Sequence, residues 1–209
     1  MAGPVVVAGV RLNAKRKMQN VPICRGSSIL QSRIGTKFLY GIKDSKKLSA
    51  KKREEWFGKL MGNSKIEWAV AKVGPKVIDR INIQKAANLG AMRVYRKLST
   101  NYESVTNLRI RRFVRDSRFV DCFALLDGSL YLPKKIPHKT IIRGDEKIPV
   151  ISAASIIAKV TRDRLMVRLH KKYPKYRFDI HKGYGTKLHK RLIKKHGISE
   201  IHRKSFRHL

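Results

Sequence analysis

Short apolar runs and helical patterns alternate along the chain. β-branched residues crowd the run Val5–Val7, which predicts a buried strand, and the runs Phe38–Ile42 and Phe119–Leu126 have the same character. Between residues 66 and 70, apolar side chains alternate with polar or small ones, which predicts a strand with one covered face.

Helical spacing fills the intervals between these runs. One helix is predicted to begin after Ser49, a favourable N-cap, and to stop at Gly62. Apolar residues at helical spacing form a stripe over residues 78–92 and another over residues 151–169, and a further helix is predicted near residues 186–195. Strands and helices therefore alternate, which predicts an α/β fold with helices packed on a sheet.

Length and composition narrow the class of protein. A chain of 209 residues, 42% of them hydrophobic, has material for one sizeable core, so we expect a single domain over residues 1–209. Lys and Arg number 49 against 14 Asp and Glu, and the formal charge of +35 indicates a polyanionic partner, above all nucleic acid. No apolar run approaches the roughly 18 residues of a membrane-spanning helix, so a membrane partner is not expected.

Two further features bear on location and on local organisation. The cysteines Cys24 and Cys122 lack metal-ligand spacing and disulfide density, and no secretory signal is evident, so we expect a cytoplasmic protein with reduced thiols. Residues 11–37 contain seven Lys or Arg and no acid, with Gly26 and two serines in the middle. This segment is predicted to be an exposed basic insertion.

Acidic residues are scarce, so their positions are informative. Asp127 follows an apolar run and precedes Gly128, and Asp145 follows the run 140–144, so each is predicted to stand at the end of a strand. Carboxylates at neighbouring strand ends suit Mg²⁺ or Mn²⁺. Either motif alone also makes an ordinary turn.

Other polar residues have plainer interpretations. Asp163 lies in a helical pattern between two arginines, which favours an ion pair with basic neighbours, and Asp44 before Ser45 favours a turn. The histidines have no partner cysteine and are predicted to enrich a basic face rather than to bind zinc. They stand at positions 181, 189, 196, 202 and 208.

Several short motifs together resemble bacterial ribonuclease HII, and they occur in the family's order. The motifs are Asp44–Ser49, Leu126–Gly128, Gly144–Asp145, Ala153–Asp163, His181–Thr186 and His202–Phe206. The opening residues 2–7 also resemble the family's second strand, so the resemblance covers nearly the whole chain.

The resemblance implies a ribonuclease H-like fold, a mixed sheet flanked by helices with a C-terminal helical segment. It also implies a site in which four acidic residues hold two divalent ions, Mn²⁺ or Mg²⁺. Asp127 and Asp145 match the third and fourth acids. The first two form an Asp-Glu pair before a Gly-Arg-Gly stretch on a central strand that would precede Ala2, and this sequence starts beyond it. We therefore expect the 209-residue chain to lack activity and to lack the central strand that would pair with its sheet.

The implied activity is two-metal hydrolysis of the RNA strand of RNA/DNA hybrids, or of ribonucleotides embedded in DNA, by a monomer. Lys46 and Lys47 precede a helix start and would bind phosphate, although a solvated pair of charges is the alternative. Tyr184 stands between two glycines, and in the family the matching tyrosine packs against the sugar at the RNA-to-DNA junction. A buried structural tyrosine is the alternative.

A second class of function stays open from sequence. The chain could be a noncatalytic basic nucleic-acid binder, either a decayed nuclease or a ribosome-associated protein. Asp127 and Asp145 favour the enzyme, and the missing Asp-Glu pair favours the binder. Coding sequence upstream with an in-frame Asp-Glu pair would separate the two.

Overall fold

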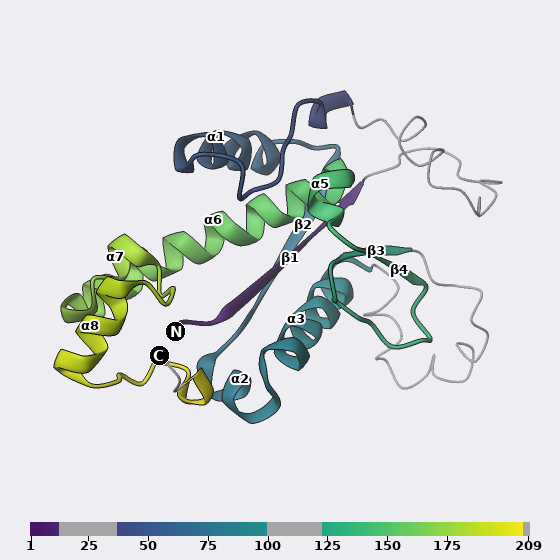
Figure 1. The fold of residues 1–209 in the computed structure, drawn as a ribbon. Helices are drawn as coiled ribbons and strands as arrows, with labels where there is room; N and C mark the ends of the chain where they lie inside the picture. The colour runs from purple at the N-terminus through teal and green to yellow at the C-terminus, as the bar shows by residue number, and fades with distance from the viewer. Residues whose placement is uncertain (13–36, 100–122, 207–209) are drawn as a thin grey trace.

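The computed structural model describes residues 1–12, 37–99 and 123–206 (Figure 1). The strands are β1 Val5–Leu12, β2 Ile66–Val73, β3 Ala124–Asp127 and β4 His138–Ile141. The α-helices are α1 Ala50–Met61, α2 Pro75–Ile81, α3 Ile83–Leu98, α5 Gly144–Lys147, α6 Pro149–Lys172, α7 Phe178–His181 and α8 Lys187–His196. Short 3₁₀ turns cover Lys37–Leu39, Pro174–Tyr176 and Lys204–Phe206. Most of the predicted basic insertion 11–37, both cysteines and residues 119–122 of a predicted strand lie outside the described residues.

The described strands form two pairs of opposite sense. β1 runs antiparallel to β2, from Val5 opposite Val73 to Leu12 opposite Ile66. β3 runs parallel to β4, and this pairing places Asp127 opposite Ile141. Because both senses of pairing occur and helices flank the strands, the predicted mixed α/β architecture is confirmed.

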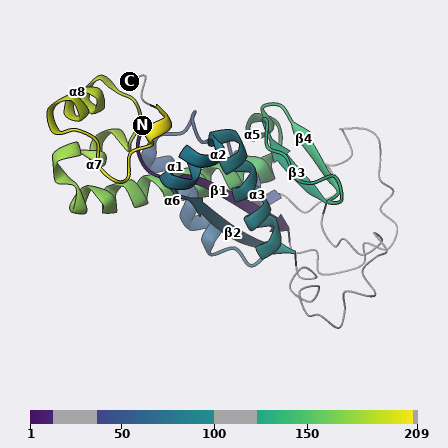
Figure 2. The same cartoon turned by 90° about the horizontal axis from the view of Figure 1, so that it is seen from below.

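Two long helices enclose β1 from opposite sides (Figures 1 and 2). Val5 and Val7 pack with residues of α2, α3 and β2, whereas Ala8, Val10 and Leu12 join the cluster formed by α6. This alternation follows from the pleat of a strand, which sends successive side chains to opposite faces. The strand predicted at Val5–Val7 is confirmed, but all eight residues of β1 are half-buried rather than buried as predicted.

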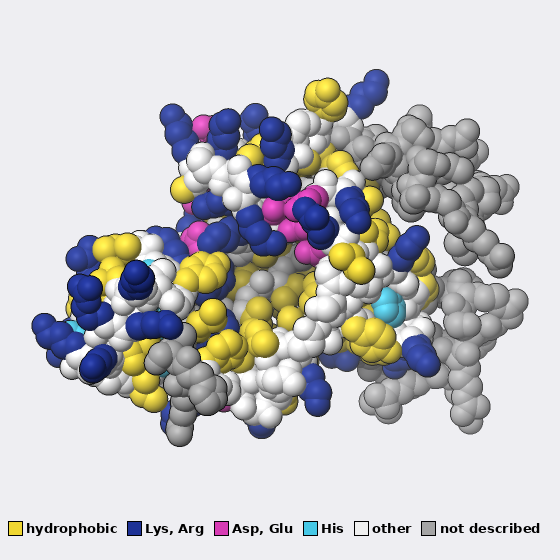
Figure 3. Space-filling view, viewed as in Figure 1, with side chains coloured by type: hydrophobic (Ala, Val, Ile, Leu, Met, Phe, Trp, Pro, Cys, Tyr) yellow, Lys and Arg dark blue, Asp and Glu magenta, His cyan; other side chains and the backbone are white. Residues whose placement is uncertain are grey.

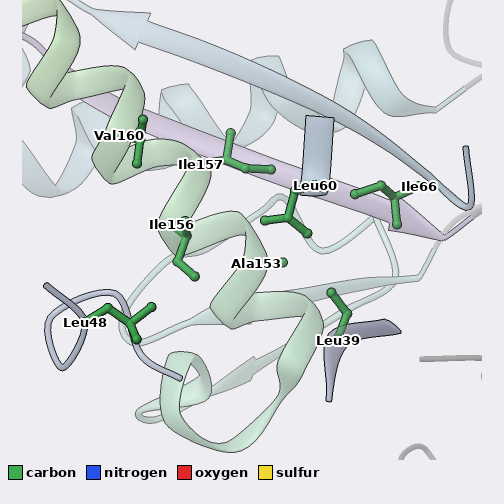
Figure 4. Close-up of a cluster of buried hydrophobic side chains, with 8 residues drawn as sticks. All are labelled: Leu39, Leu48, Leu60, Ile66, Ala153, Ile156, Ile157 and Val160. Carbon is green, nitrogen blue, oxygen red and sulfur yellow. The ribbon is translucent and has the colours of Figure 1, made fainter. Parts of the chain in front are cut away.

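The largest apolar cluster lies between α6, α1 and β2 (Figure 4). Ile156, Ile157 and Val160 of α6 contribute to it together with Leu60 of α1 and Ile66 of β2. The remaining buried members are Leu39, Leu48 and Ala153. Leu39 and Leu48 flank the turn at residues 44–47, so this core fixes that turn against the N-terminal half of α6.

Three local predictions are wrong. The run Phe38–Ile42 is a 3₁₀ turn followed by a bend rather than a strand, and Gly41 has a φ of +79°. The stripe over residues 78–92 is divided into α2 and α3 by Asn82, whose φ of +67° breaks the helix and whose side chain caps α3. In β2 the fully buried face is that of residues 69, 71 and 73, while Trp68 on the other face is 44% exposed.

The other predicted helices are confirmed. Ser49 caps α1 by accepting a hydrogen bond from the Lys52 N–H, and Gly62 ends it. α6 covers the predicted stripe at residues 151–169, and Thr186 caps α8. Within the described ranges, no helix is both long and apolar enough to span a bilayer.

Candidate active site

Asp127 and Asp145 meet where β3 and the short helix α5 come together. Asp127 is the last residue of β3, and its Oδ1 accepts hydrogen bonds from the backbone N–H groups of Gly144 (2.8 Å) and Asp145 (3.3 Å). A Cβ on Gly144 would lie 2.8 Å from Ile151 Cδ1 and 3.3 Å from Asp127 Oδ1, so a larger residue here would displace the Ile151 side chain and crowd this carboxylate. The first turn of α5 is thereby fixed to the end of β3.

The position of Asp145 differs from the one predicted. The strand β4 ends at Ile141, and Asp145 lies four residues later in the first turn of α5 rather than at the strand end. Its neighbour Arg143 adopts a left-handed conformation, which reverses the chain between strand and helix. The two predicted acids are still brought together, because the Asp127 side chain binds the backbone of Asp145 itself.

Asp145 sits in a negative environment and is only 5% exposed. Burial raises the pKa of its carboxyl, and the nearby charges of Asp127 and Asp44 raise it further, while Lys46 acts in the opposite direction. The Lys46 Nζ lies 3.4 Å from Asp145 Oδ2, and this carboxylate raises the pKa of the lysine. Asp44, Asp127 and Asp145 therefore form a partly buried acidic cluster, and the ammonium group of Lys46 lies beside it.

Asp44 has both the expected role and an unexpected one. Its Oδ1 accepts from the Lys46 N–H at 3.0 Å and its carbonyl oxygen accepts from the Lys47 N–H at 3.0 Å, so the predicted turn is confirmed. The side chain is also buried at 5% exposure, and its charge acts on Asp145. Sequence reasoning missed this second role, because only the tertiary fold brings residues 44 and 145 together.

Lys46 and Lys47 form an exposed pair at the edge of the acidic cluster. The Lys46 side chain is 79% exposed, and Lys47 Nζ lies 3.5 Å from Glu146 Oε2. The turn that carries them is held to α6 by a hydrogen bond of 2.8 Å between Ser45 Oγ and Ser155 Oγ. In the space-filling view, acidic side chains gather near α5 and are surrounded by Lys and Arg (Figure 3).

Tyr184 lies in a different part of the structure, between α7 and α8. Its side chain is 43% exposed, which argues against the buried alternative. Two cations of α6 contact its ring: Lys159 Nζ lies 4.8 Å and Arg162 Cζ 4.5 Å from the centroid. Lys159 Nζ also donates to the Tyr184 hydroxyl at 3.2 Å, so the ring stands on a basic surface of α6.

The backbone before Tyr184 is tightly held. Gly183 has a φ of +77°, and a Cβ there would lie 2.6 Å from the carbonyl oxygen of Ala2. The Gly183 carbonyl accepts a hydrogen bond of 3.0 Å from the Ala2 N–H. Gly183, which the sequence associates with close approach of a ligand, is thus also in close contact with Ala2 at the N-terminus of the chain.

Asp163 forms the predicted structural ion pair. Lys159 Nζ lies 2.8 Å from Asp163 Oδ1, one helical turn away on α6. The partner is this lysine rather than one of the flanking arginines. Arg164 instead pairs with Glu54 of α1 at 2.5 Å.

The prediction that the histidines enrich a basic face is wrong for three of them. His181, His189 and His202 are buried and contact one another, with ring centroids 4.2 Å apart for the first two and 5.2 Å apart for the last two. His196 is exposed, and His208 lies outside the described residues. No local pattern in the sequence predicts this cluster, apart from the positions of His181 and His189 on either side of Tyr184.

The donor atoms at Asp127 and Asp145 fit a hard divalent cation. Both are carboxylates, the ligand type that Mg²⁺ and Mn²⁺ prefer. Burial raises the pKa of Asp145 most, and the charges of Asp127 and Asp44 raise it further, and a bound cation would offset both effects. Among the described residues, no group of three or more His, Cys, Asp or Glu side chains is arranged to hold a metal ion.

Comparison with known proteins places these features in one family. The sequence pattern of the family described as ribonuclease HII matches residues 31–209. A ribonuclease HII from Coxiella burnetii is 38% identical over 208 residues, which cover 99% of this chain and 82% of the relative. A ribonuclease HII from Bacillus thuringiensis is 43% identical over 169 residues, which cover 81% of this chain and 58% of the relative.

Solved structures agree with the sequence comparison. A ribonuclease HII from Archaeoglobus fulgidus, solved in complex with PCNA, has a TM-score of 0.56 and 26% identity, and the match covers 97% of this chain and 86% of that one. Ribonuclease H2 from Pyrococcus horikoshii has the same fold, with a TM-score of 0.57 at 23% identity over 97% of this chain and 94% of that chain. The expected ribonuclease H-like fold is therefore confirmed, and the chain belongs to the ribonuclease HII family.

Proposed function

We propose that this chain serves as an endonuclease that hydrolyses the RNA strand of RNA/DNA hybrids, or ribonucleotides embedded in DNA, in replication and repair. The observation that carries the proposal is the contact of Asp127 with the backbone of Gly144 and Asp145, which joins two acids from separate motifs. Membership of the ribonuclease HII family supports the same reaction.

Asp127 and Asp145 are proposed as the catalytic metal ligands of the chain. Their oxygens would hold divalent ions, Mn²⁺ or Mg²⁺, two of them in the complete site. Such ions supply an activated water and stabilise the leaving oxygen in phosphodiester hydrolysis. The role of the protein is to hold the ligands in place. The hydrogen bonds from the Gly144 and Asp145 N–H groups to Asp127 do this by fixing α5 to the end of β3.

Lys46 and Lys47 are proposed to bind a phosphate of the substrate. Both ammonium groups are exposed, and the turn beneath them is anchored by Asp44 and by the Ser45–Ser155 hydrogen bond. Lys46 also contacts Asp145, so a phosphate bound by this lysine would lie beside the metal ligands. Charge-assisted contacts of this kind position a nucleic acid without reading its sequence.

Tyr184 is proposed to pack against the sugar at the junction between RNA and DNA. Its ring is 43% exposed, and Lys159 and Arg162 lie over it at 4.8 and 4.5 Å from the centroid, so the exposed part of the ring stands beside two cations. Aromatic rings next to basic groups are a common platform for nucleotides. This tyrosine would distinguish substrates by geometry, which bulk charge does not do.

The remaining charge serves general affinity for the substrate. A formal charge of +35 favours binding to phosphate backbones, and the proposed partner is a hybrid or ribonucleotide-containing duplex bound by a monomer in the cytoplasm. The basic insertion 11–37 would add to this attraction in a single domain over residues 1–209, and its structure lies outside the described residues.

One observation favours a second function, noncatalytic binding of nucleic acid. Among the residues that the structure describes, no group of three or more His, Cys, Asp or Glu side chains is arranged to hold a metal ion, so this part of the chain would bind substrate without completing a metal site. The two functions differ in the effect of an added Asp-Glu pair. Only the enzyme gains activity when the two missing acids are provided.

The test uses the 209-residue chain and a supplemented chain, defined as the same residues fused after a family segment with the Asp-Glu pair and Gly-Arg-Gly stretch. With Mg²⁺ or Mn²⁺, the supplemented chain should cleave the RNA strand of a hybrid and leave 3'-hydroxyl and 5'-phosphate ends, whereas the 209 residues alone should show little cleavage. Failure of a folded supplemented chain to cleave would support the binder. Robust metal-dependent cleavage by the 209 residues would refute the need for four acids.

A further inference from the structure

The three buried histidines lie behind the segment that carries Tyr184. His189 is 0% and His202 3% exposed, and His181 is also buried. Phe178 contacts all three rings at centroid distances of 5.7–5.8 Å. Histidines enclosed in this way keep their nitrogens satisfied only by specific hydrogen bonds. Their partners therefore show what the cluster does.

The hydrogen bonds of His189 and His202 have one consistent direction. The Ser199 N–H donates to His202 Nδ1 at 2.9 Å, so this nitrogen is an acceptor and the proton of His202 is on Nε2. His202 Nε2 lies 3.1 Å from His189 Nε2 and donates to it. His189 therefore carries its proton on Nδ1, which lies 2.8 Å from the carbonyl oxygen of Tyr184 and donates to it.

The same chain of hydrogen bonds is stable at neutral pH. Burial lowers the pKa of both His189 and His202 to about 4, so both rings are neutral at pH 7, and their hydrogen bonds set which nitrogen carries the proton. His181 acts in parallel: its Nε2 donates to the Tyr176 carbonyl at 2.7 Å, and its Nδ1 accepts the Gly183 N–H at 3.1 Å. Neighbouring histidines thus bind the backbone on both sides of the Gly183–Tyr184 peptide bond.

We propose that His189 is a positioning residue for Tyr184, held in the required tautomer by His202 and Ser199, and that it contributes to discrimination of ribonucleotide-containing duplexes. The proposal rests on the proposed function, because it assumes that Tyr184 contacts the substrate. His189 itself is buried and touches no substrate. It acts by fixing the carbonyl of the residue whose ring is exposed.

Two separate sets of contacts then define the place of Tyr184. Lys159 and Arg162 of α6 hold the ring, whereas His189 of α8 holds the backbone. Loss of the backbone contact would leave the ring present but free to shift. The consequence is a loss of selectivity with little change in affinity for plain duplex DNA, which depends on Lys and Arg contacts to phosphate.

The test compares two substitutions that differ in the position of their donor. In His189→Asn the side-chain amide lies near the place of Nδ1 and can still donate to the Tyr184 carbonyl. In His189→Gln the amide lies near the place of Nε2 and reaches His202 instead. His196→Asn on the exposed end of the same helix is the matched control.

The readout is the ratio of affinities for a duplex with one ribonucleotide and for the all-DNA duplex of the same sequence, measured by fluorescence anisotropy in EDTA. One lost hydrogen bond corresponds to about a two- to tenfold fall in this ratio. We expect that fall for His189→Gln, a ratio near that of the unsubstituted chain for His189→Asn and for the control, and similar melting temperatures. In a Tyr184→Ala background, His189→Gln should have no further effect.

Each contrary result has a distinct meaning. If Tyr184→Ala leaves the ratio unchanged, the proposed role of Tyr184 fails and this inference falls with it. If Tyr184→Ala lowers the ratio and a folded His189→Gln does not, the inference alone is refuted. Long-range ¹H–¹⁵N NMR of the histidine rings tests the chain independently of folding variants, and a proton on Nε2 of His189 at pH 7 would overturn it.

Discussion

Replacement of Tyr184 by alanine tests whether the site reads substrate geometry. The change removes a ring that is 43% exposed and stands beside Lys159 and Arg162. Stacking of an aromatic ring on a nucleotide contributes about 1–3 kcal/mol, or about a five- to 150-fold effect. We therefore expect the supplemented chain to lose activity at a lone ribonucleotide in duplex DNA by about that factor.

The structure also indicates what the substitution should leave intact. The ring makes exposed cation–π contacts, each worth about 0.5–1 kcal/mol, so the cost to folding should be small. Tyr184→Phe keeps the ring and loses only the hydroxyl that accepts from Lys159, so it should retain most of the activity. Affinity for plain duplex DNA should barely change in either variant.

The assay is single-turnover cleavage of a duplex with one ribonucleotide, alongside anisotropy with the all-DNA duplex and a thermal melt of each variant. Normal cleavage by Tyr184→Ala would refute the junction-reading role. Loss of cleavage that follows loss of folding would also refute it, because the tyrosine would then be structural. A Tyr184→Phe variant as impaired as Tyr184→Ala would show that the hydroxyl, rather than the ring, is required.

Three further predictions concern stability and binding. The folded chain holds the pKa of His189 and His202 at about 4 against 6.5 when unfolded, so as pH falls from 6.5 towards 4 the unfolded state takes up protons that the folded state does not. The free energy of unfolding should therefore fall by up to about 3 kcal/mol for each ring, and a flat urea-derived value between pH 7 and 5 would contradict this. Gly183→Ala should lower the free energy of unfolding by about 1–3 kcal/mol or more, because the new Cβ would clash with the Ala2 carbonyl and the backbone has a positive φ. Gly41→Ala is the control, because Gly41 also has a positive φ but has open space around it. If Gly183→Ala costs no more than Gly41→Ala in a thermal melt, the close contact is refuted. Duplex affinity should fall steeply between low and moderate salt and less steeply when the seven basic charges of residues 11–37 are removed, and an unchanged slope would make that segment a bystander.

Local signals in the sequence were sufficient for much of the fold. Ser49 and Gly62 bracket α1 because a hydroxyl N-cap and a terminal glycine act within one turn of helix. Asn82 was missed because apolar spacing continues through it while its backbone does not. The covered face of β2 was also misjudged, since the small residues Ala69 and Ala71 face α3 and the large Trp68 does not.

The candidate site was predicted only in part, for a physical reason. Asp127 follows an apolar run and Asp145 follows the run 140–144, so their local context points to neighbouring strand ends, although Asp145 lies in α5. Asp44 is buried beside them because segments about 100 residues apart in the sequence pack together. No local pattern in the sequence predicts such a contact. The histidine cluster was missed for the same reason, because histidines are expected on the surface of a basic chain unless tertiary contacts enclose them.

The proposed role of Asp127 as a metal ligand of a nuclease is tested by metal-dependent cleavage of an RNA/DNA hybrid by Asp127→Asn in the supplemented chain. Asp163→Asn is the matched control, because this acid pairs with Lys159 on α6. We expect Asp127→Asn to abolish cleavage with Mg²⁺ and Mn²⁺ while hybrid affinity stays largely intact, and Asp163→Asn to remain active. Near-normal turnover by a folded Asp127→Asn would show that Asp127 is not a metal ligand of the reaction.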